Sequence, residues 1–210
     1  ELRTKGNVPI GTLLGMNLLL AVAAPIESAP AAGAEVQQVV IGGLAVSVWM
    51  TIMLILGLRH RAGRTTLLDR ADAFSEGHTG LPGWTILPYA IAVIALAIAG
   101  VGFVWDVSLH LDTGRDPGPF ANPSHYMLIV GTVLFVTAGW LAVVIPKGRA
   151  AGDAGVRIAK DWYAPAGGVA LLACGSLSVT GFAADDVWHR LFGQDVTLWG
   201  PTHLMMITGG

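Results

Sequence analysis

The feature that most constrains this chain is a succession of long apolar runs separated by short polar stretches. A helix that crosses a bilayer needs about 20 predominantly apolar residues. Of the 210 residues, 53% are hydrophobic and only 12% are charged, whereas a soluble domain has about 25% charged residues. Because every backbone group in lipid must be satisfied within the chain, such runs become helices. The sequence therefore predicts an all-α polytopic membrane helix bundle, with residues 1–210 forming a single integral membrane domain.

Five complete apolar runs and the start of a sixth predict at least six transmembrane helices. The stretches between the runs contain the Gly, Pro and charged residues typical of loops. His60 and His78 lie in one of these stretches, and we expect both to be solvated side chains. The complete runs cover residues 8–26, 36–58, 84–109, 124–146 and 165–189, and the sixth begins near residue 203.

The distribution of basic residues predicts the orientation of the chain. If the N-terminus is cytoplasmic, ten of the 12 Lys and Arg residues lie on the cytoplasmic side, and only Arg115 and Arg190 lie on the other. This asymmetry is typical of an integral protein of the bacterial plasma membrane type. The loops after the third and fifth runs are then extracytoplasmic. A net charge of -2 argues against a nucleic-acid partner, and a single cysteine leaves no disulfide framework.

Residues 102–131 and 181–209 share a pattern that indicates an internal repeat. Six residues of the first stretch recur 79 positions later, and four more recur 78 positions later after a loop that is one residue shorter. Chance would give about two identities over this length. The sequence therefore predicts a duplicated helix–loop–helix unit. The recurring residues of the first stretch are Gly102, Phe103, Asp106, His110, Gly114, Asp116, Pro123, His125, Met127 and Gly131.

The repeated polar residues have the chemistry of a metal site. An Asp and a His four residues apart share one face of a helix, and the second His of each unit opens the returning helix at the same membrane level. One carboxylate and two imidazoles suit copper(II), zinc or non-haem iron. Ionisable groups at membrane depth usually mark function. The predicted ligands are Asp106, His110 and His125 in the first unit, and Asp185, His189 and His203 in the second.

Other residues near these clusters receive different interpretations. Asp116 and Asp195 lie in the loops, and we expect them to support the site as outer-shell or turn residues. Met127 is expected to pack against a neighbouring helix, as is Met205. Asp186 offers a carboxylate that competes with Asp185, so the sequence leaves open which of the two faces the histidines. It assigns no catalytic residue.

The motif Asp-x3-His followed by Pro-(Ser/Thr)-His, present twice, resembles the metal motif of one membrane-embedded subunit of the copper membrane monooxygenases, the particulate methane and ammonia monooxygenase family. In that family the first unit supplies an Asp-His-His copper site, and the second supplies an Asn-His-His site nearby. The resemblance covers residues 102–131 and 181–209, and it implies copper at both predicted clusters. Asp185 stands where the family has Asn.

The resemblance implies a subunit of a copper-dependent membrane oxidase or monooxygenase complex. A chain of this size, without a large soluble domain, is expected to need other membrane subunits for electrons and further metals, in contact with membrane lipid. A copper-handling protein, either a transporter or a metallochaperone, is one alternative. A haem b-binding subunit with two histidine ligands and a purely structural membrane subunit are the others.

Overall fold

The computed structural model of the chain describes residues 33–114, 119–150, 152–193 and 198–210. These residues all belong to one compact unit, Ala31–Gly210. The apolar run predicted at residues 8–26 lies outside the described residues, and so do Asp116 and Asp195. The prediction of a single domain over the whole chain is therefore untested.

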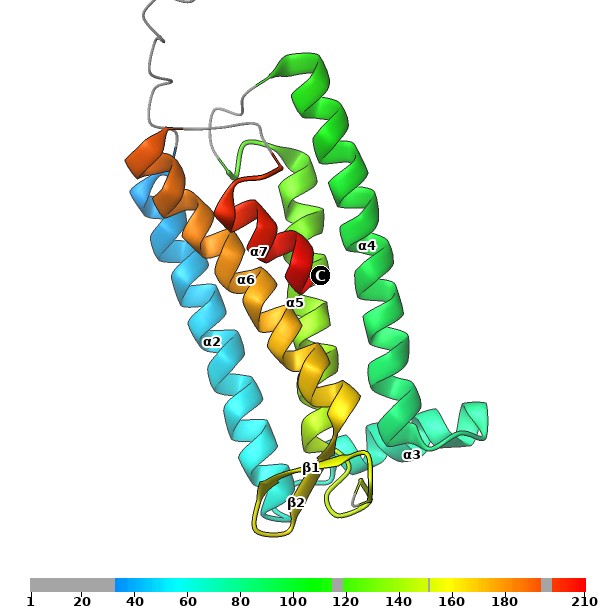
Figure 1. Cartoon of the computed structure of the whole chain (residues 1–210). Helices are drawn as coiled ribbons and strands as arrows, with labels where there is room; N and C mark the ends of the chain where they lie inside the picture. The colour runs from blue at the N-terminus through cyan, green and yellow to red at the C-terminus, as the bar shows by residue number, and fades with distance from the viewer. Residues whose placement is uncertain (1–32, 115–118, 151, 194–197) are drawn as a thin grey trace, which may run out of the picture. The chain divides into compact units, whose positions relative to one another are not determined.

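The described residues are mostly helical, as the sequence predicts (Figure 1). Four helices are long and apolar enough to cross a membrane: α2, α4, α5 and α6. Their ends lie within a few residues of the predicted runs, whereas the short α7 starts at the sixth run. The helices are α2 (Val36–Arg61), α3 (Leu67–Thr79), α4 (Gly83–Thr113), α5 (Pro123–Val144), α6 (Ala166–Phe192) and α7 (Pro201–Gly209).

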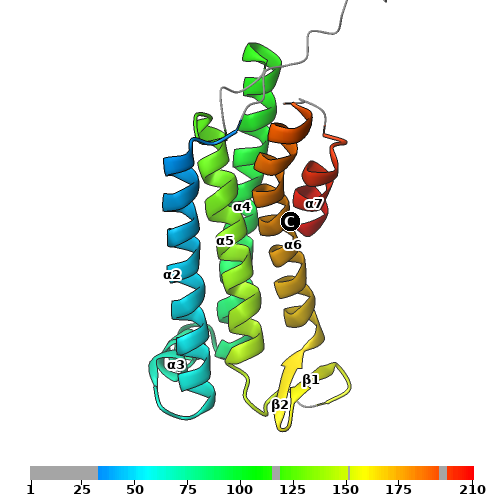
Figure 2. The same ribbon diagram turned by 90° about the vertical axis from the view of Figure 1, so that its left-hand side faces the viewer.

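Proline sets the start of both returning helices. Pro123 is the first residue of α5, and Pro201 is the first residue of α7. Proline is tolerated there because the first backbone N–H groups of a helix have no partner within the helix. At both prolines the chain turns back, so that the start of each returning helix lies beside the end of the preceding one (Figure 2).

α5 is the most buried of the four long helices and packs against both α4 and α6. Small residues allow these helix backbones to approach closely. A Cβ added to Gly139 of α5 would lie 2.6 Å from the Cα of Leu172 of α6, and one added to Gly168 would lie 2.8 Å from the Cβ of Ala142. The two helices therefore meet backbone to backbone.

Corresponding positions of α4–α5 and α6–α7 make corresponding contacts. A Cβ added to Gly102 would lie 2.8 Å from the Cβ of Met127, and one added to Gly181 would lie 2.9 Å from the Cβ of Met205. Both methionines thus pack against a glycine of the preceding helix, as predicted.

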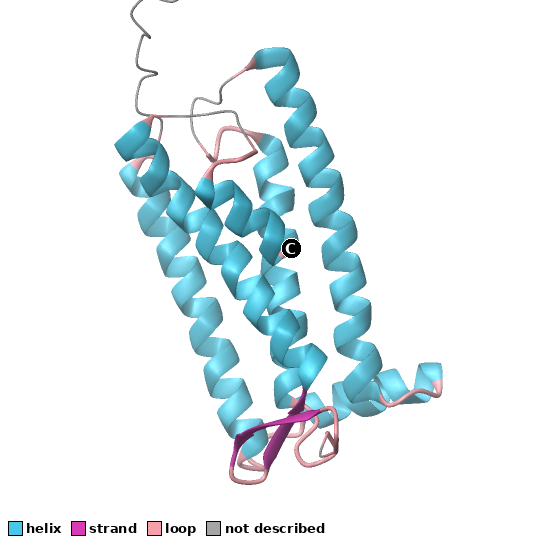
Figure 3. Ribbon diagram, in the orientation of Figure 1, coloured by secondary structure: helices cyan, strands magenta, loops and turns pink. Residues whose placement is uncertain are grey.

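The end of the bundle opposite the α4–α5 and α6–α7 connections carries α3 and a β-hairpin (Figure 3). The hairpin pairs β1 (Gly155–Ala159) with β2 (Trp162–Pro165) in antiparallel register, with Val156 opposite Ala164. The sequence predicts loops for both segments, so α3 and the hairpin differ from that expectation. We refer to this end of the bundle as the base.

The expectation of a solvated His60 is wrong. His60 is fully buried, and its Nδ1 lies 3.7 Å from Oδ2 of Asp69 on α3. Lys147, just beyond α5, donates a 2.9 Å hydrogen bond to Oδ1 of Asp69, and this bond lowers the pKa of the Asp69 carboxyl. The ion pair between Lys147 and Asp69 therefore fastens α3 to the end of α5, beside the buried His60. His78, by contrast, is exposed as predicted.

Candidate metal centre

The first predicted cluster lies where the end of α4 meets the start of α5. Oδ2 of Asp106 is 3.5 Å from Nδ1 of His110, one helical turn later, and Oδ1 of Asp106 is 2.9 Å from Nε2 of His125 on α5. The Asp106 carboxylate therefore lies beside both histidines of the predicted set, while Nδ1 of His110 lies closer, at 2.9 Å, to the Asp106 backbone carbonyl. The rings of His110 and His125 are roughly parallel, with centroids 6.4 Å apart.

Two polar side chains that the sequence analysis did not single out support Asp106. Asn122 caps α5, and its Nδ2 donates a 2.8 Å hydrogen bond to Oδ1 of Asp106. The Ser124 hydroxyl donates a second bond, of 2.7 Å, to the same oxygen. Both side chains are buried, so their bonds to the carboxylate are protected from water. A signal was present in the sequence, because each Pro-x-His carries a hydroxyl residue immediately before its histidine.

The second predicted cluster lies where the end of α6 meets the start of α7. Oδ2 of Asp185 is 3.5 Å from Nδ1 of His189, and Oδ1 of Asp185 is 3.3 Å from Nε2 of His203. Thr202 occupies the place of Ser124, and its hydroxyl donates a 2.5 Å hydrogen bond to Oδ1 of Asp185. One ligand atom from each of Asp185, His189 and His203 lies within 4.8 Å of the other two.

The structure also shows which of the two adjacent carboxylates faces the histidines. Asp186 points away from them: its Oδ1 accepts a 2.6 Å hydrogen bond from the backbone N–H of Ala34, and its Oδ2 accepts one of 2.8 Å from Nε of Arg190. Arg190 also donates to the Ala34 carbonyl. Asp186 therefore ties α6 to the residues before α2, while Asp185 faces His189 and His203.

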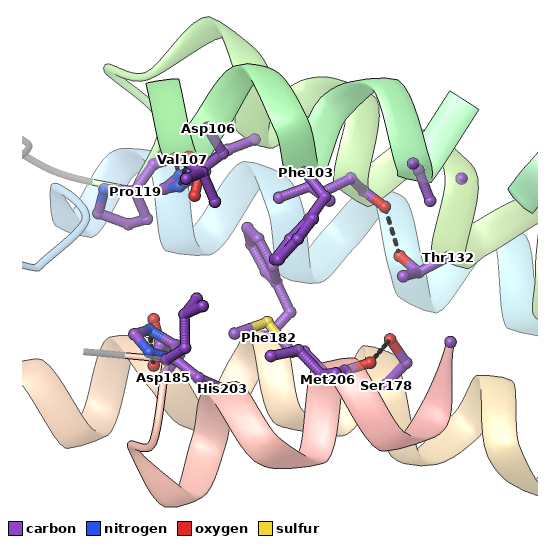
Figure 4. A pocket seen from close by; sticks show the side chains of 18 of the residues that line it. Phe103, Asp106, Val107, Pro119, Thr132, Ser178, Phe182, Asp185, His203 and Met206 are labelled. Carbon is purple, nitrogen blue, oxygen red and sulfur yellow. Dashed lines mark hydrogen bonds and ion pairs between the residues drawn. The ribbon is translucent and has the colours of Figure 1, made fainter. Parts of the chain in front are cut away.

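The two clusters line one cavity of about 500 Å³. Figure 4 shows Asp106 on one wall and Asp185 with His203 on the opposite wall, with Phe103 and Phe182 alongside. The ring of Phe182 meets that of His125 edge to face, with centroids 6.0 Å apart. Apart from the clusters, the lining is mainly aliphatic and aromatic, with Thr132 and Ser178 on the deeper walls.

The donor set fits a divalent transition metal. Nε2 of His189 is buried and has no hydrogen-bond partner among the described residues, which leaves it suited to be a ligand. Nδ1 of His125 lies 2.7 Å from the Pro119 carbonyl, a contact that orients the ring with Nε2 toward Asp106. Such carbonyl contacts to the outer nitrogen are typical of metal-binding histidines. Carboxylate and imidazole ligands suit copper, zinc and iron.

These observations define the class of the molecule: a helical protein with four candidate membrane-spanning helices and two Asp–His–His clusters at one end of its bundle. No protein-family model, curated protein or solved structure matches the chain.

Proposed function

We propose that this protein is a copper-binding integral membrane subunit of an oxidase or monooxygenase complex. One observation carries the proposal: two Asp–His–His clusters face a single, mainly apolar cavity at one end of a bundle of membrane-length helices. Polar side chains that were merely solvated at a protein surface would not be buried or half-buried beside an apolar cavity, as these imidazoles are. Ionisable residues at such depth usually mark function. Copper is preferred over zinc because of the resemblance to the copper membrane monooxygenases and because copper(II) binds such ligands more tightly.

The proposal includes a duplicated helix pair, at least six membrane spans and an extracytoplasmic position for the clusters. The matching contacts of Gly102 with Met127 and of Gly181 with Met205 support the duplication. The extracytoplasmic position is supported by the basic residues, because those within the described part of the chain gather at the base, except Arg190. The six spans would be the four described helices of membrane-spanning length, the apolar run at residues 8–26 and the run that begins near residue 203.

In this function the chain itself would hold the metal, orient it and exclude water. Asp185, His189 and His203 would form one ligand set, and Asp106, His110 and His125 the other. Bound copper would supply the redox chemistry with dioxygen. Phe103 and Phe182 would keep the deeper cavity dry and favour a small apolar substrate that enters from lipid or from the outer face. Electrons would come from other membrane subunits.

Metal analysis of matched variants tests the ligand assignment. We expect Asp106→Ala and Asp185→Ala each to lower the copper content of the purified protein, because each removes the carboxylate that both histidines of its cluster face. Asp186→Ala is the control, since it removes a neighbouring carboxylate that faces Ala34 and Arg190 instead. Undiminished copper in both ligand variants would refute the ligand assignment.

Spectroscopy of the same protein separates copper from haem b. We expect an electron paramagnetic resonance signal of type 2 copper and no Soret band. A Soret band that disappears in His110→Ala or His189→Ala would instead establish the haem-binding alternative. If zinc were retained in preference to copper under equal loading, redox catalysis at the clusters would be excluded.

A copper-handling role is the second candidate, favoured by the fact that both clusters open onto the same cavity. Two ligand sets along one chamber would allow an ion to pass from one to the other. Isolation of the chain without large hydrophobic partners, together with rapid exchange of its copper with a chelator, would favour this role. Stable association with other membrane subunits and slowly exchanging copper would favour the enzyme complex.

A further inference from the structure

One edge of α3 is apolar and exposed. This helix lies at the base, at the opposite end of the bundle from the metal clusters. Leu67 and Phe74 are seven residues apart and share this edge of the helix, and Leu81 follows directly beyond it. Their exposed fractions are 58%, 66% and 54%. The ring of Phe74 stacks on that of His78, with centroids 4.1 Å apart. No other part of the described chain therefore covers these apolar side chains.

The connections of α3 fix its depth relative to a membrane. Only residues 62–66 separate it from α2, and only residues 80–82 separate it from α4, and both neighbours are of membrane-spanning length. Both ends of α3 are thus held at the ends of membrane spans. Trp84 and Trp162 lie at the same level, packed on the buried cluster that includes Leu68. Tryptophans at this level are typical of a membrane–water interface.

The acidic and basic side chains of α3 differ in whether they are paired within the protein. Its two central acids are neutralised within the protein: Asp69 pairs with Lys147 at 2.9 Å, and Asp72 pairs with Arg149 at 2.6 Å. Arg70 of α3 and Arg64 just before it remain exposed. Of the exposed charges of α3, Arg70 therefore lies beside the apolar edge, and Glu76 lies on the opposite side of the helix.

We propose that α3 is an interfacial helix that binds the anionic lipid leaflet on the base side of the bundle. Leu67, Phe74 and Leu81 insert at the boundary between headgroups and acyl chains, as the apolar faces of interfacial helices do. Arg64 and Arg70 bind lipid phosphates, each arginine contributing a roughly fivefold preference for anionic over neutral lipid. Leu68, Asp69 and Asp72 fix the helix to the bundle, so the lipid-binding edge is rigid. This inference is independent of the metal.

Spin labels at two exposed positions test the insertion. The chain has a single cysteine, Cys174, so Cys174→Ala gives a background in which Phe74→Cys and Glu76→Cys can be labelled one at a time. Position 76 is about 200° around the helix from position 74, and it serves as the matched control. In vesicles of phosphatidylcholine and phosphatidylglycerol, we expect the label at 74 to collide mainly with dissolved oxygen. The label at 76 should collide mainly with a water-soluble nickel chelate.

The outcome that overturns the insertion is equal access of the nickel chelate to both labels, because a face reserved for a protein partner would be wet in vesicles of the pure protein. A fluorophore at position 74 then tests the charge contribution. We expect spin-labelled phosphatidylglycerol to quench it more strongly than spin-labelled phosphatidylcholine, and Arg64→Gln with Arg70→Gln to remove most of that difference. Equal quenching by both lipids in the labelled protein that retains Arg64 and Arg70 would refute the binding of anionic lipid.

Discussion

The helix pairs α4–α5 and α6–α7 place the same residues in the same order but hold their carboxylates differently. In each pair the first helix carries Asp and His four residues apart, and the second begins at a proline that is followed by the other His. Oδ1 of Asp106 accepts from Asn122, Ser124 and His125. Among the described residues, Oδ1 of Asp185 meets only Thr202 and the more distant His203.

The difference shows that equal ligand sets need not bind a cation equally well. A carboxylate oxygen has two lone-pair directions, and three donors already surround Oδ1 of Asp106. A metal at that oxygen would displace at least one of these hydrogen bonds. Oδ1 of Asp185 has fewer donors, and Nε2 of His189 in the same cluster has no hydrogen-bond partner among the described residues. We therefore expect the α6–α7 cluster to bind metal more tightly than the α4–α5 cluster.

The largest expected effect tests whether the two pairs share one packing geometry. Gly102→Val and Gly181→Val should each destabilise the protein by about 1–3 kcal/mol or more, because the new side chain would overlap a methionine of the partner helix. Thermal unfolding in detergent measures the loss. Gly100→Val and Gly167→Val are matched controls, since an added Cβ there meets no atom of the described chain within 4 Å. Similar loss in the controls would contradict the shared geometry.

The second prediction sharpens the difference between the carboxylates. Thr202→Val removes the one hydroxyl in the described part of the chain that orients the Asp185 carboxylate, a single bond that still leaves a lone pair of Oδ1 for the metal. Outer-shell losses of this kind weaken metal binding by about 10–100-fold. Ser124→Ala should weaken binding less at Asp106, because Asn122 still donates to the same oxygen. Competition with a chelator gives both dissociation constants. A Ser124→Ala effect equal to or larger than that of Thr202→Val would contradict our account of the two carboxylates.

A third prediction concerns Asp186, which has no counterpart on α4. Asp186→Asn should leave the metal content unchanged and lower the free energy of unfolding by at most about 1 kcal/mol, because its partner Arg190 is partly exposed and such pairs are weak. Metal analysis and thermal unfolding of the same preparation check both parts. Loss of metal would show that this residue affects the cluster and would break the distinction from Asp185.

The smallest expected effect concerns the base, where Lys147 follows α5 and pairs with Asp69 of α3. The hydrogen bond from Lys147 lowers the pKa of Asp69 below its ordinary value of about 4. A carboxyl with a lowered pKa stabilises the fold above that ordinary value, and the stabilisation is lost as the pH falls toward the lowered pKa. Asp69→Asn should therefore melt slightly earlier than the wild type at pH 6, and the difference should shrink below about pH 4. A difference that grows on acidification would contradict this sign.

The sequence predicted the long helices well because the length of an apolar run is a local property. It missed α3 because a helix that packs one narrow face, here Leu68 and Asp72, can be as polar as a loop. It also assigned His60 to solvent, because the surroundings of that ring include Asp69 of the unpredicted α3 and, through its ion pair, Lys147, which is distant in sequence.

Some features of the candidate site could be predicted from the sequence, and others could not. The repeat predicted both Asp–His–His sets, which the structure brings together, but spacing alone could not distinguish Asp185 from Asp186. That distinction depends on the backbone of Ala34, 152 residues away. The supporting roles of Asn122, Ser124 and Thr202 likewise follow from contacts across a loop.

The close contact of α5 with α6 has a mechanical consequence for the cavity. Gly139 marks a place where these two helices meet with almost no side chain between them. His125 lies 14 residues away along α5, which corresponds to about 21 Å. The two helices can tilt about such a contact, and the displacement of a residue grows with its distance from the contact. A tilt of about 3° between the two pairs would change the separation of their clusters by about 1 Å, comparable to half a metal–ligand bond.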